Sequence, residues 1–378
     1  MKIHLWEYAP SPHLGNVLKG MADRGYATRY VVHSESYAHR LAEGWVRPEF
    51  SGVEIIQATN IEEIRAIIAD SIPNDVHICV GLRANDYNRE VCSELRAANR
   101  RFLLFMETID ERSRFSVLKR PLYRMLFMRN RRWLEGVLAA GARTPQWVAS
   151  RGVARTRIFD FAYFLGTREA YPQQQREDES YKFVFVGNLI HRKQVHLIIA
   201  AMGKLPENVK LDVIGDGALR ADLEKQAAAQ APGRITFRGV RPMSDIPGFM
   251  AAADCLVLPS HHDGWGSVIP EAMLAGTPVV CSDSCGASAV VRASGRGVVF
   301  EASAPGACAA ALGAQIAQGR PSATERAALA DWALCLTEPA GAAYLDSIIS
   351  YLRHDAPRPV PPWAATNPMP LPREETLT

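Results

Sequence analysis

One stretch of the sequence, residues 254–283, constrains the fold of this chain more than any other. It opens with the apolar run DCLVL, which predicts a buried strand, and continues through a loop that contains Gly264 and Gly266. An apolar segment with one carboxylate follows, and it predicts a helix that Gly276 ends. Residues 279–281 then predict a second buried strand. A strand, a glycine loop, a helix and a strand in this order predict a parallel α/β sheet.

The glycine loop and the first turn of the expected helix have the features of an anion site. The backbone N–H groups of Gly266, Ser267 and Val268 would point out of the helix N-terminus, where the helix dipole favours negative charge. Glu271 follows one turn later, and a carboxylate among apolar residues needs hydrogen-bond donors such as the hydroxyls of a sugar or a ribose. Asp263 precedes Glu271 by eight positions. The two carboxylates therefore bracket the expected anion site.

Length and composition are those of an ordinary globular protein with two domains. The chain has 378 residues and a formal net charge of +3, so its overall charge gives no reason to expect a nucleic-acid partner. No apolar run reaches about 18 residues, which predicts that no helix crosses a membrane. The opening run, MKIHLWEYAP, is typical of a strand rather than of a signal peptide. The seven cysteines predict buried free thiols in a reducing cytosol, and no grouping of Cys and His predicts a metal site.

The first half of the chain predicts alternating strands and helices. Residues 2–8 predict a strand, a turn with His13 and Gly15 follows, and residues 16–24 predict a helix. Further strands are expected at residues 27–33, 53–58, 76–82, 102–106, 137–140 and 157–164. No GxGxxG motif follows the first strand, which argues against a dinucleotide-binding dehydrogenase.

The second half repeats this alternation after a polar linker at residues 166–180. We therefore predict an α/β protein with two domains, residues 1–165 and 181–338, each built on a doubly wound parallel sheet. Residues 339–353 predict a last helix, and the proline-rich residues 354–378 predict a tail that buries no core.

The string at residues 263–280 resembles the signature of retaining glycosyltransferases of the GT-B fold, family four (glycosyltransferase group 1). That family carries two acids eight positions apart, a Gly-aromatic-Gly loop between them, and EAM/LAxGxPVV after the second acid. Here these are Asp263, Gly264-Trp265-Gly266 and Glu271 with the residues that follow it. The first acid is usually Glu in the family, so Asp263 keeps the head group with a reach shorter by one methylene. The resemblance implies two Rossmann-like domains that face each other across a cleft, with residues 339–353 crossing back onto the first.

The resemblance also implies that the second domain binds a nucleoside diphosphate sugar of the UDP or GDP type, without a metal or other cofactor. Lys193 stands where the family has a lysine that binds the diphosphate. Asn188 stands at the position of the family's arginine and Gln194 at that of its second glycine, so whether Arg192 supplies the missing charge stays open. The implied donor-binding set is Gly15, Gly187, Asn188, Arg192, Gly215, Val240, Arg241, Gly264, Trp265, Gly266, Ser267, Val268 and Glu271.

Four residues make up the implied catalytic set. Lys193 holds the diphosphate, Glu271 binds the ribose hydroxyls, and Asp263 stabilises the oxocarbenium-like sugar. Glu107 follows the strand at 102–106, at a place where many members of the family have a histidine. Two interpretations of Glu107 stay open, namely a group that contacts the acceptor hydroxyl, as a base if its pKa fits, and a surface carboxylate at the end of a strand.

A basic stretch at residues 112–133 contains eight Lys and Arg residues, no acid, and many interleaved apolar side chains. This composition favours the surface of a membrane with anionic lipid, and the alternative is a helix with a solvated basic face. The resemblance makes Lys119, Arg120 and Arg124 candidates for the acceptor or membrane side. His13 is either an acceptor contact or a solvated loop residue, and the second interpretation is slightly favoured.

The resemblance as a whole implies a retaining hexosyltransferase that moves a sugar onto a glycan or a lipid-linked acceptor in the biosynthesis of cell-surface polysaccharide. It implies a cytoplasmic enzyme at the inner face of the plasma membrane. Three alternatives stay open: a sugar-nucleotide epimerase or phosphorylase of the same fold, a sugar-nucleotide-binding module without catalysis, and a nucleic-acid binder.

Overall fold

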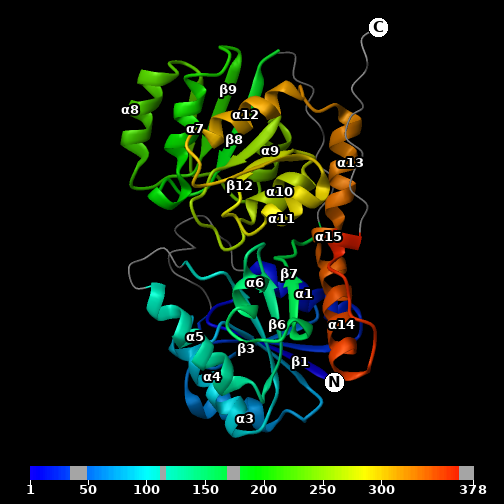
Figure 1. Ribbon diagram of the computed structural model, residues 1–378. Coiled ribbons are helices and arrows are strands. Elements are labelled where there is room, and N and C mark those ends of the chain that lie inside the picture. Colours follow the sequence, from blue (N-terminus) through cyan, green and yellow to red (C-terminus); the bar gives the residue numbers. More distant parts are fainter. Residues whose placement is uncertain (35–48, 111–115, 168–178, 366–378) are drawn as a thin grey trace. The chain divides into compact units, whose positions relative to one another are not determined.

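The computed structural model describes residues 1–34, 49–110, 116–167 and 179–365 (Figure 1). The chain forms two compact units. Unit 1 consists of Met1–Thr167 and Leu336–Pro362, and unit 2 consists of Arg168–Cys335 and Trp363–Thr378.

Unit 1 is built on a parallel sheet of seven strands in the order β3-β2-β1-β4-β5-β6-β7. This is the order of a doubly wound sheet, in which the chain moves outward in both directions from its first strand. The strands are β1 Lys2–Glu7, β2 Ala27–Val32, β3 Val53–Gln57, β4 Val76–Val80, β5 Phe102–Glu107, β6 Leu134–Ala140 and β7 Ile158–Phe161.

Helices cover both faces of this sheet. In Figure 1, α3, α4 and α5 lie on one side, while α1 packs against α14 on the other. Asparagine side chains cap α3 and α4, because Asn60 accepts from the N–H of Glu63 and Asn85 accepts from the N–H of Asn88. The helices of unit 1 are α1 Pro12–Asp23, α3 Ile61–Ala69, α4 Asp86–Ala97, α5 Ser116–Asn130, α6 Thr144–Ala149, the 3₁₀ turn η1 Arg155–Arg157 and α14 Glu338–Arg353.

Unit 2 has a six-stranded parallel sheet in the order β10-β9-β8-β11-β12-β13. Its strands are β8 Tyr181–Val186, β9 Val209–Ile214, β10 Ile235–Gly239, β11 Cys255–Leu258, β12 Val279–Ser282 and β13 Gly297–Phe300. Its helices are η2 His191–Lys193, α7 Val195–Met202, α8 Arg220–Gln230, α9 Ile246–Ala251, α10 Val268–Leu274, α11 Ser288–Ser294, α12 Ala307–Ala317 and α13 Ala323–Ala333. Two short elements, η3 Leu334–Leu336 and α15 Pro362–Ala365, lie where the chain passes between the units.

The central strands are mostly apolar, as expected for strands that are covered on both faces. Every residue of β11 and β12 is buried. The stretch at 254–283 therefore forms the strand, loop, helix and strand that its pattern predicts. Six of the cysteines are buried free thiols, and Cys335 is half-buried.

The first helix begins earlier than the sequence predicts. Pro12 opens α1, where its missing N–H costs nothing, and the backbone N–H of Ser11 donates to the Tyr30 hydroxyl at 2.8 Å. The expected turn with His13 and Gly15 is therefore the first turn of a helix, and both residues are buried there.

The C-terminal segment of unit 1 is held by arginines. Arg353, at the end of α14, pairs with Glu135 at 2.7 Å. Beyond it, in the region predicted as a tail, Arg358 donates to the carbonyl oxygens of Thr156 and Ile158. No helix within the described part of the chain is both long enough and apolar enough to cross a membrane.

Candidate functional site

Asp263 lies at the centre of a charged cluster in unit 2. Its Oδ2 is 2.6 Å from Lys193 Nζ, and its Oδ1 is 3.5 Å from Arg192 Nη1. The Ser260 hydroxyl lies 3.4 Å from Oδ2. The side chains of Asp263 and Lys193 are each 12% exposed, so little water screens their charges. Two cations share one carboxylate, which leaves positive charge for an anionic ligand.

Backbone hydrogen bonds fix both cations beside the loop that follows β11. The guanidinium of Arg192 donates to the carbonyl oxygen of His262 at 2.9 Å, and the N–H of His261 donates to the carbonyl oxygen of Arg192 at 2.8 Å. The backbone carbonyl and the side chain of Arg192 thus both hold the turn η2 against this loop. Arg192 therefore stands beside Lys193 at the cluster, while Asn188 is exposed.

The loop after β11 pairs with the loop after β12. The N–H of Asp263 donates to Ser284 O at 3.1 Å, and the N–H of Gly286 donates back to Asp263 O at 3.0 Å. A Cβ at position 286 would lie 1.9 Å from the carbonyl oxygen of Gly264. Only glycine fits there, so Gly286 is part of the machinery that positions Asp263. The small residues of that second loop were its only signal in the sequence.

The loops after β8 and β9 also meet through glycines. Gly215 has a φ of +125°, and a Cβ there would lie 2.1 Å from the carbonyl oxygen of Gly187. A Cβ at Gly217 would lie 2.6 Å from Leu189 O. The close approach of these two loops gives a packing reason for Gly215, for which the family resemblance implies donor contact.

Gln194 has a backbone conformation that suits glycine. It links η2 to α7 with a φ of +51°, in the left-handed region. Its amide Oε1 is buried and has no hydrogen-bond partner in the described part of the chain. This strained residue directly follows Lys193, at the position where the resembling family has a glycine.

The glycine loop and α10 stand as the sequence predicts, with one correction. The first hydrogen bond of this turn runs from the N–H of Ile269 to Gly266 O at 2.9 Å, so the preceding N–H groups have no partner within the helix. Glu271 is half-buried within α10. The Trp265 side chain is only 2% exposed, so the ring belongs to the core, and the Trp265 carbonyl oxygen accepts from the N–H of Ala287 at 2.8 Å.

Val240 and Arg241 lie apart from this cluster. Both follow β10, the edge strand, which is two positions from β8 in the sheet. Val240 is 53% exposed, and the Arg241 guanidinium lies 6.0 Å from the centre of the Phe249 ring. The structure therefore does not bring them against Asp263.

Two predicted site residues in unit 1 are packed in the interior. His13 is buried and stacks on Tyr163 with ring centres 4.8 Å apart, so the favoured interpretation as a solvated loop residue is wrong. A Cβ at Gly15 would lie 2.0 Å from Phe50, whose ring covers this part of α1. Packing against Phe50, rather than a ligand, accounts for the glycine.

The remaining predicted residues of unit 1 lie at the end of β5 and on α5. Glu107 is the last residue of β5 and is half-buried. Lys119 donates from Nζ to the carbonyl oxygen of Asp110 at 2.7 Å, while Arg120 and Arg124 are exposed on the helix.

Residues 167–326, which contain the Asp263 cluster, match the family model described as "Glycosyl transferases group 1". This matched segment, which is less than half of the chain, is called the group 1 domain below. The resemblance inferred from the motif is thereby confirmed.

Curated relatives match over parts of the chain. The chain is 40% identical over 99 residues to a 2-deoxystreptamine glucosyltransferase of Streptomyces kanamyceticus, covering 25% of this chain and 26% of that protein. It is 36% identical over 117 residues to the lipopolysaccharide core biosynthesis glycosyltransferase LpsE of Rhizobium meliloti, covering 31% and 34%. The matches thus span about a quarter to a third of these relatives' lengths.

Solved structures are similar over both units. A structure of HepE from Anabaena in complex with UDP matches with a TM-score of 0.69 at 18% identity, covering 93% of this chain and all of that chain. The apo lipopolysaccharide outer core galactosyltransferase WaaB matches with a TM-score of 0.71 at 13% identity, covering 93% and 99%. At such identities the likeness concerns the fold. It confirms the prediction of two Rossmann-like domains with the GT-B fold.

Proposed function

We propose that the protein is a retaining glycosyltransferase that transfers a sugar from a nucleoside diphosphate sugar to a glycan or lipid-linked acceptor. The observation that carries the proposal is the cluster of Lys193 and Arg192 around Asp263, inside the group 1 domain. A diphosphate leaving group needs such cations, because charge develops on it as the glycosidic bond breaks.

The roles of the residues follow from their places. Lys193 and Arg192 contact the diphosphate, and the N–H groups at the start of α10 supply further donors. Asp263 pairs with Lys193 before the donor binds and faces the sugar, where its negative charge stabilises the oxocarbenium-like transition state. Glu271 accepts hydrogen bonds from the ribose hydroxyls.

The proposed transfer occurs on one face of the sugar. The bond between the anomeric carbon and the phosphate oxygen breaks, and the acceptor oxygen bonds to the same carbon from the same side. The acceptor proton passes to the departing phosphate oxygen. No metal takes part in this scheme, so a chelator should leave the rate unchanged.

UDP is the first donor nucleotide to test. HepE was solved with UDP and with UDP-glucose, which supports a uridine nucleotide for this fold. Two relatives act in envelope polysaccharide pathways by name, LpsE in lipopolysaccharide core and TuaC in teichuronic acid biosynthesis. We propose an acceptor of that class, a growing glycan or its lipid-linked precursor.

Thermal unfolding with UDP, GDP, ADP and CMP tests the donor site. At about 100 times its Kd, the correct nucleotide should stabilise the protein by about 2.7 kcal/mol and raise the Tm of unit 2 by roughly 5 °C or more. Lys193→Ala should abolish the shift. Lys225→Ala, which alters an exposed lysine of α8, should keep it.

The products then separate the remaining alternatives. NMR of the reaction with acceptor should show the anomeric configuration of the donor retained. Turnover of the nucleotide sugar into an epimer without acceptor would instead indicate an epimerase. A nucleotide shift of the same size in Lys193→Ala, or no shift with any nucleotide, would refute the proposed donor site.

A further inference from the structure

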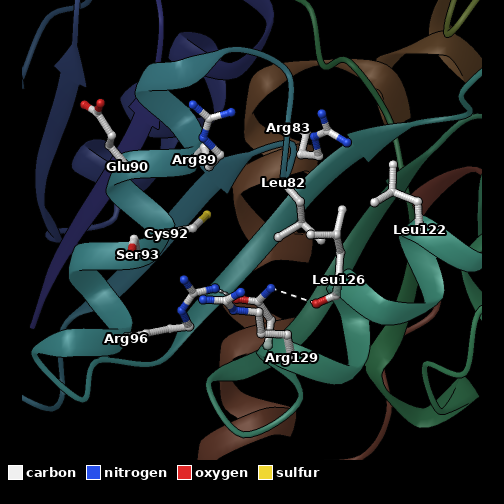
Figure 2. Close-up of a pocket in the computed structure, with 11 residues that line it drawn as sticks. Leu82, Arg83, Arg89, Glu90, Cys92, Ser93, Arg96, Leu122, Leu126 and Arg129 are labelled. Atoms are coloured by element: carbon white, nitrogen blue, oxygen red, sulfur yellow. Dashed lines mark hydrogen bonds between the residues drawn. The ribbon is translucent and has the colours of Figure 1, made fainter. Parts of the chain in front are cut away.

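A second candidate site lies in unit 1, in a cavity of about 450 Å³ between α4 and α5 (Figure 2). Arg96 and Arg129 come from the two helices and lie near each other, and Arg83 comes from the loop that follows β4. Leu126 lies between Arg83 and Arg129 in Figure 2, and Leu122 adds an apolar side chain beside Arg83. The cavity is thus a groove with basic walls and an apolar lining.

Four arginines and one carboxylate, Glu90, line this groove, so its basic charge is only partly compensated. Of the four arginines that line it, Arg89 pairs with Asp86 at 2.9 Å, and Arg96 donates only to the neutral amide oxygen of Asn130 at 2.8 Å. Arg83 and Arg129 have no carboxylate within ion-pair distance in the described part of the chain. Burial, and next the charge of Arg129, lower the pKa of Arg96. A bound anion would relieve this repulsion.

The apolar lining narrows the class of anion. Leu82 is buried at the base of the groove, and Leu122 and Leu126 are half-buried along its side. On the outer surface of α5, Met125 and Met128 are each 53% exposed, although large exposed apolar side chains are few in the described part of the chain. A small inorganic anion would leave the leucines in contact with water, whereas an anion attached to an alkyl chain would cover them.

We propose that this groove binds the phosphate head group of an anionic lipid. The guanidinium groups of Arg83, Arg96 and Arg129 bind the phosphate oxygens, since guanidinium presents paired donors that match phosphate. The first methylenes of the lipid lie along Leu122 and Leu126. This is a defined pocket, distinct from general attraction of the basic surface of α5 to a membrane.

Titration of the intact protein with dihexanoyl phosphatidic acid, kept below its micelle concentration, tests the proposal by calorimetry. We expect saturable binding that weakens at least about tenfold in Arg83→Gln combined with Arg129→Gln, because two charge-assisted contacts are lost. Ser93→Trp, which fills the groove without changing its charge, should weaken binding to a similar degree. Arg124→Gln removes an exposed charge of α5 outside the groove and should change binding less than twofold.

The remaining outcomes overturn the proposal. An equal loss in Arg124→Gln would mean that diffuse surface charge binds the lipid. Inorganic phosphate that binds as tightly as the lipid would mean that the leucines play no part, and the absence of saturable binding would mean that the groove is not a site. The thermal unfolding transition of unit 1, which contains all the substituted residues, shows whether each variant remains folded.

Discussion

At the scale of single residues, Asp263 has two tasks that a substitution can separate. Its carboxylate neutralises Lys193 and Arg192 before the donor binds, and it is proposed to face the sugar during transfer. Asp263→Asn keeps the shape and removes the charge. We expect UDP to bind as tightly or up to about tenfold more tightly, because the cations lose a competitor, while kcat falls at least ~100-fold.

Calorimetry with UDP and initial rates measure the two effects. Asp222→Asn, an exposed change on α8, is the matched control and should alter neither. Loss of UDP binding in Asp263→Asn would show instead that the carboxylate is needed to place Lys193.

Gln194 offers a second test at this scale. With a φ of +51° and a buried amide oxygen, it stores strain of about 1 kcal/mol that glycine would not have. Gln194→Gly should therefore raise the free energy of unfolding of unit 2 by up to about 1 kcal/mol in urea unfolding. Gln194→Ala keeps the strained backbone with a Cβ and should gain less. A destabilised Gln194→Gly would mean that the side chain forms contacts that outweigh the strain.

At the scale of elements, the site depends on two loops that only glycine lets meet. Gly286→Ala would place a Cβ 1.9 Å from Gly264 O, a contact between backbones that neither loop can relieve without moving Asp263. We expect the UDP-induced thermal shift to be lost and unit 2 to be destabilised by more than ~1 kcal/mol. Gly313→Ala lies within α12, meets nothing within 4 Å, and should stabilise by up to about 1 kcal/mol. Normal UDP binding in Gly286→Ala would show that the pairing of these loops is not needed for the donor site.

Local patterns predicted the elements well but not their contacts. The apolar runs of β11 and β12 and the glycine stop after α10 are each encoded by adjacent residues, so the unit at 254–283 could be read directly. The pairing of the loops at Asp263 and Gly286 joins segments whose register depends on the whole sheet. The groove between α4 and α5 arises in the same way, since Arg83, Arg96 and Arg129 are dispersed in the sequence.

At the scale of the whole molecule, the two units should differ in their response to acid. The buried histidines of the described chain, His4, His13 and His77, all belong to unit 1. Burial lowers the pKa of His4 to about 4 and that of His77 to about 3, and their rings stack 4.8 Å apart. In the unfolded chain both would take up protons near pH 6.5. Their neutral forms therefore stabilise unit 1 fully above that pH, and the stabilisation is lost as the pH falls from 6.5 towards 4.

Calorimetry as a function of pH should then resolve two unfolding transitions. The transition of unit 1 should lose about 3 kcal/mol between pH 6.5 and 4 from His4 alone, by 1.36 kcal/mol per pKa unit, whereas UDP should move only the transition of unit 2. Replacing His4 and His77 together by glutamine should reduce this loss of stability between pH 6.5 and 4. His354→Gln, which alters an exposed histidine, should leave the loss unchanged. A single transition that shifts with both acid and UDP would mean that the units unfold together, so that a ligand of one unit stabilises the other.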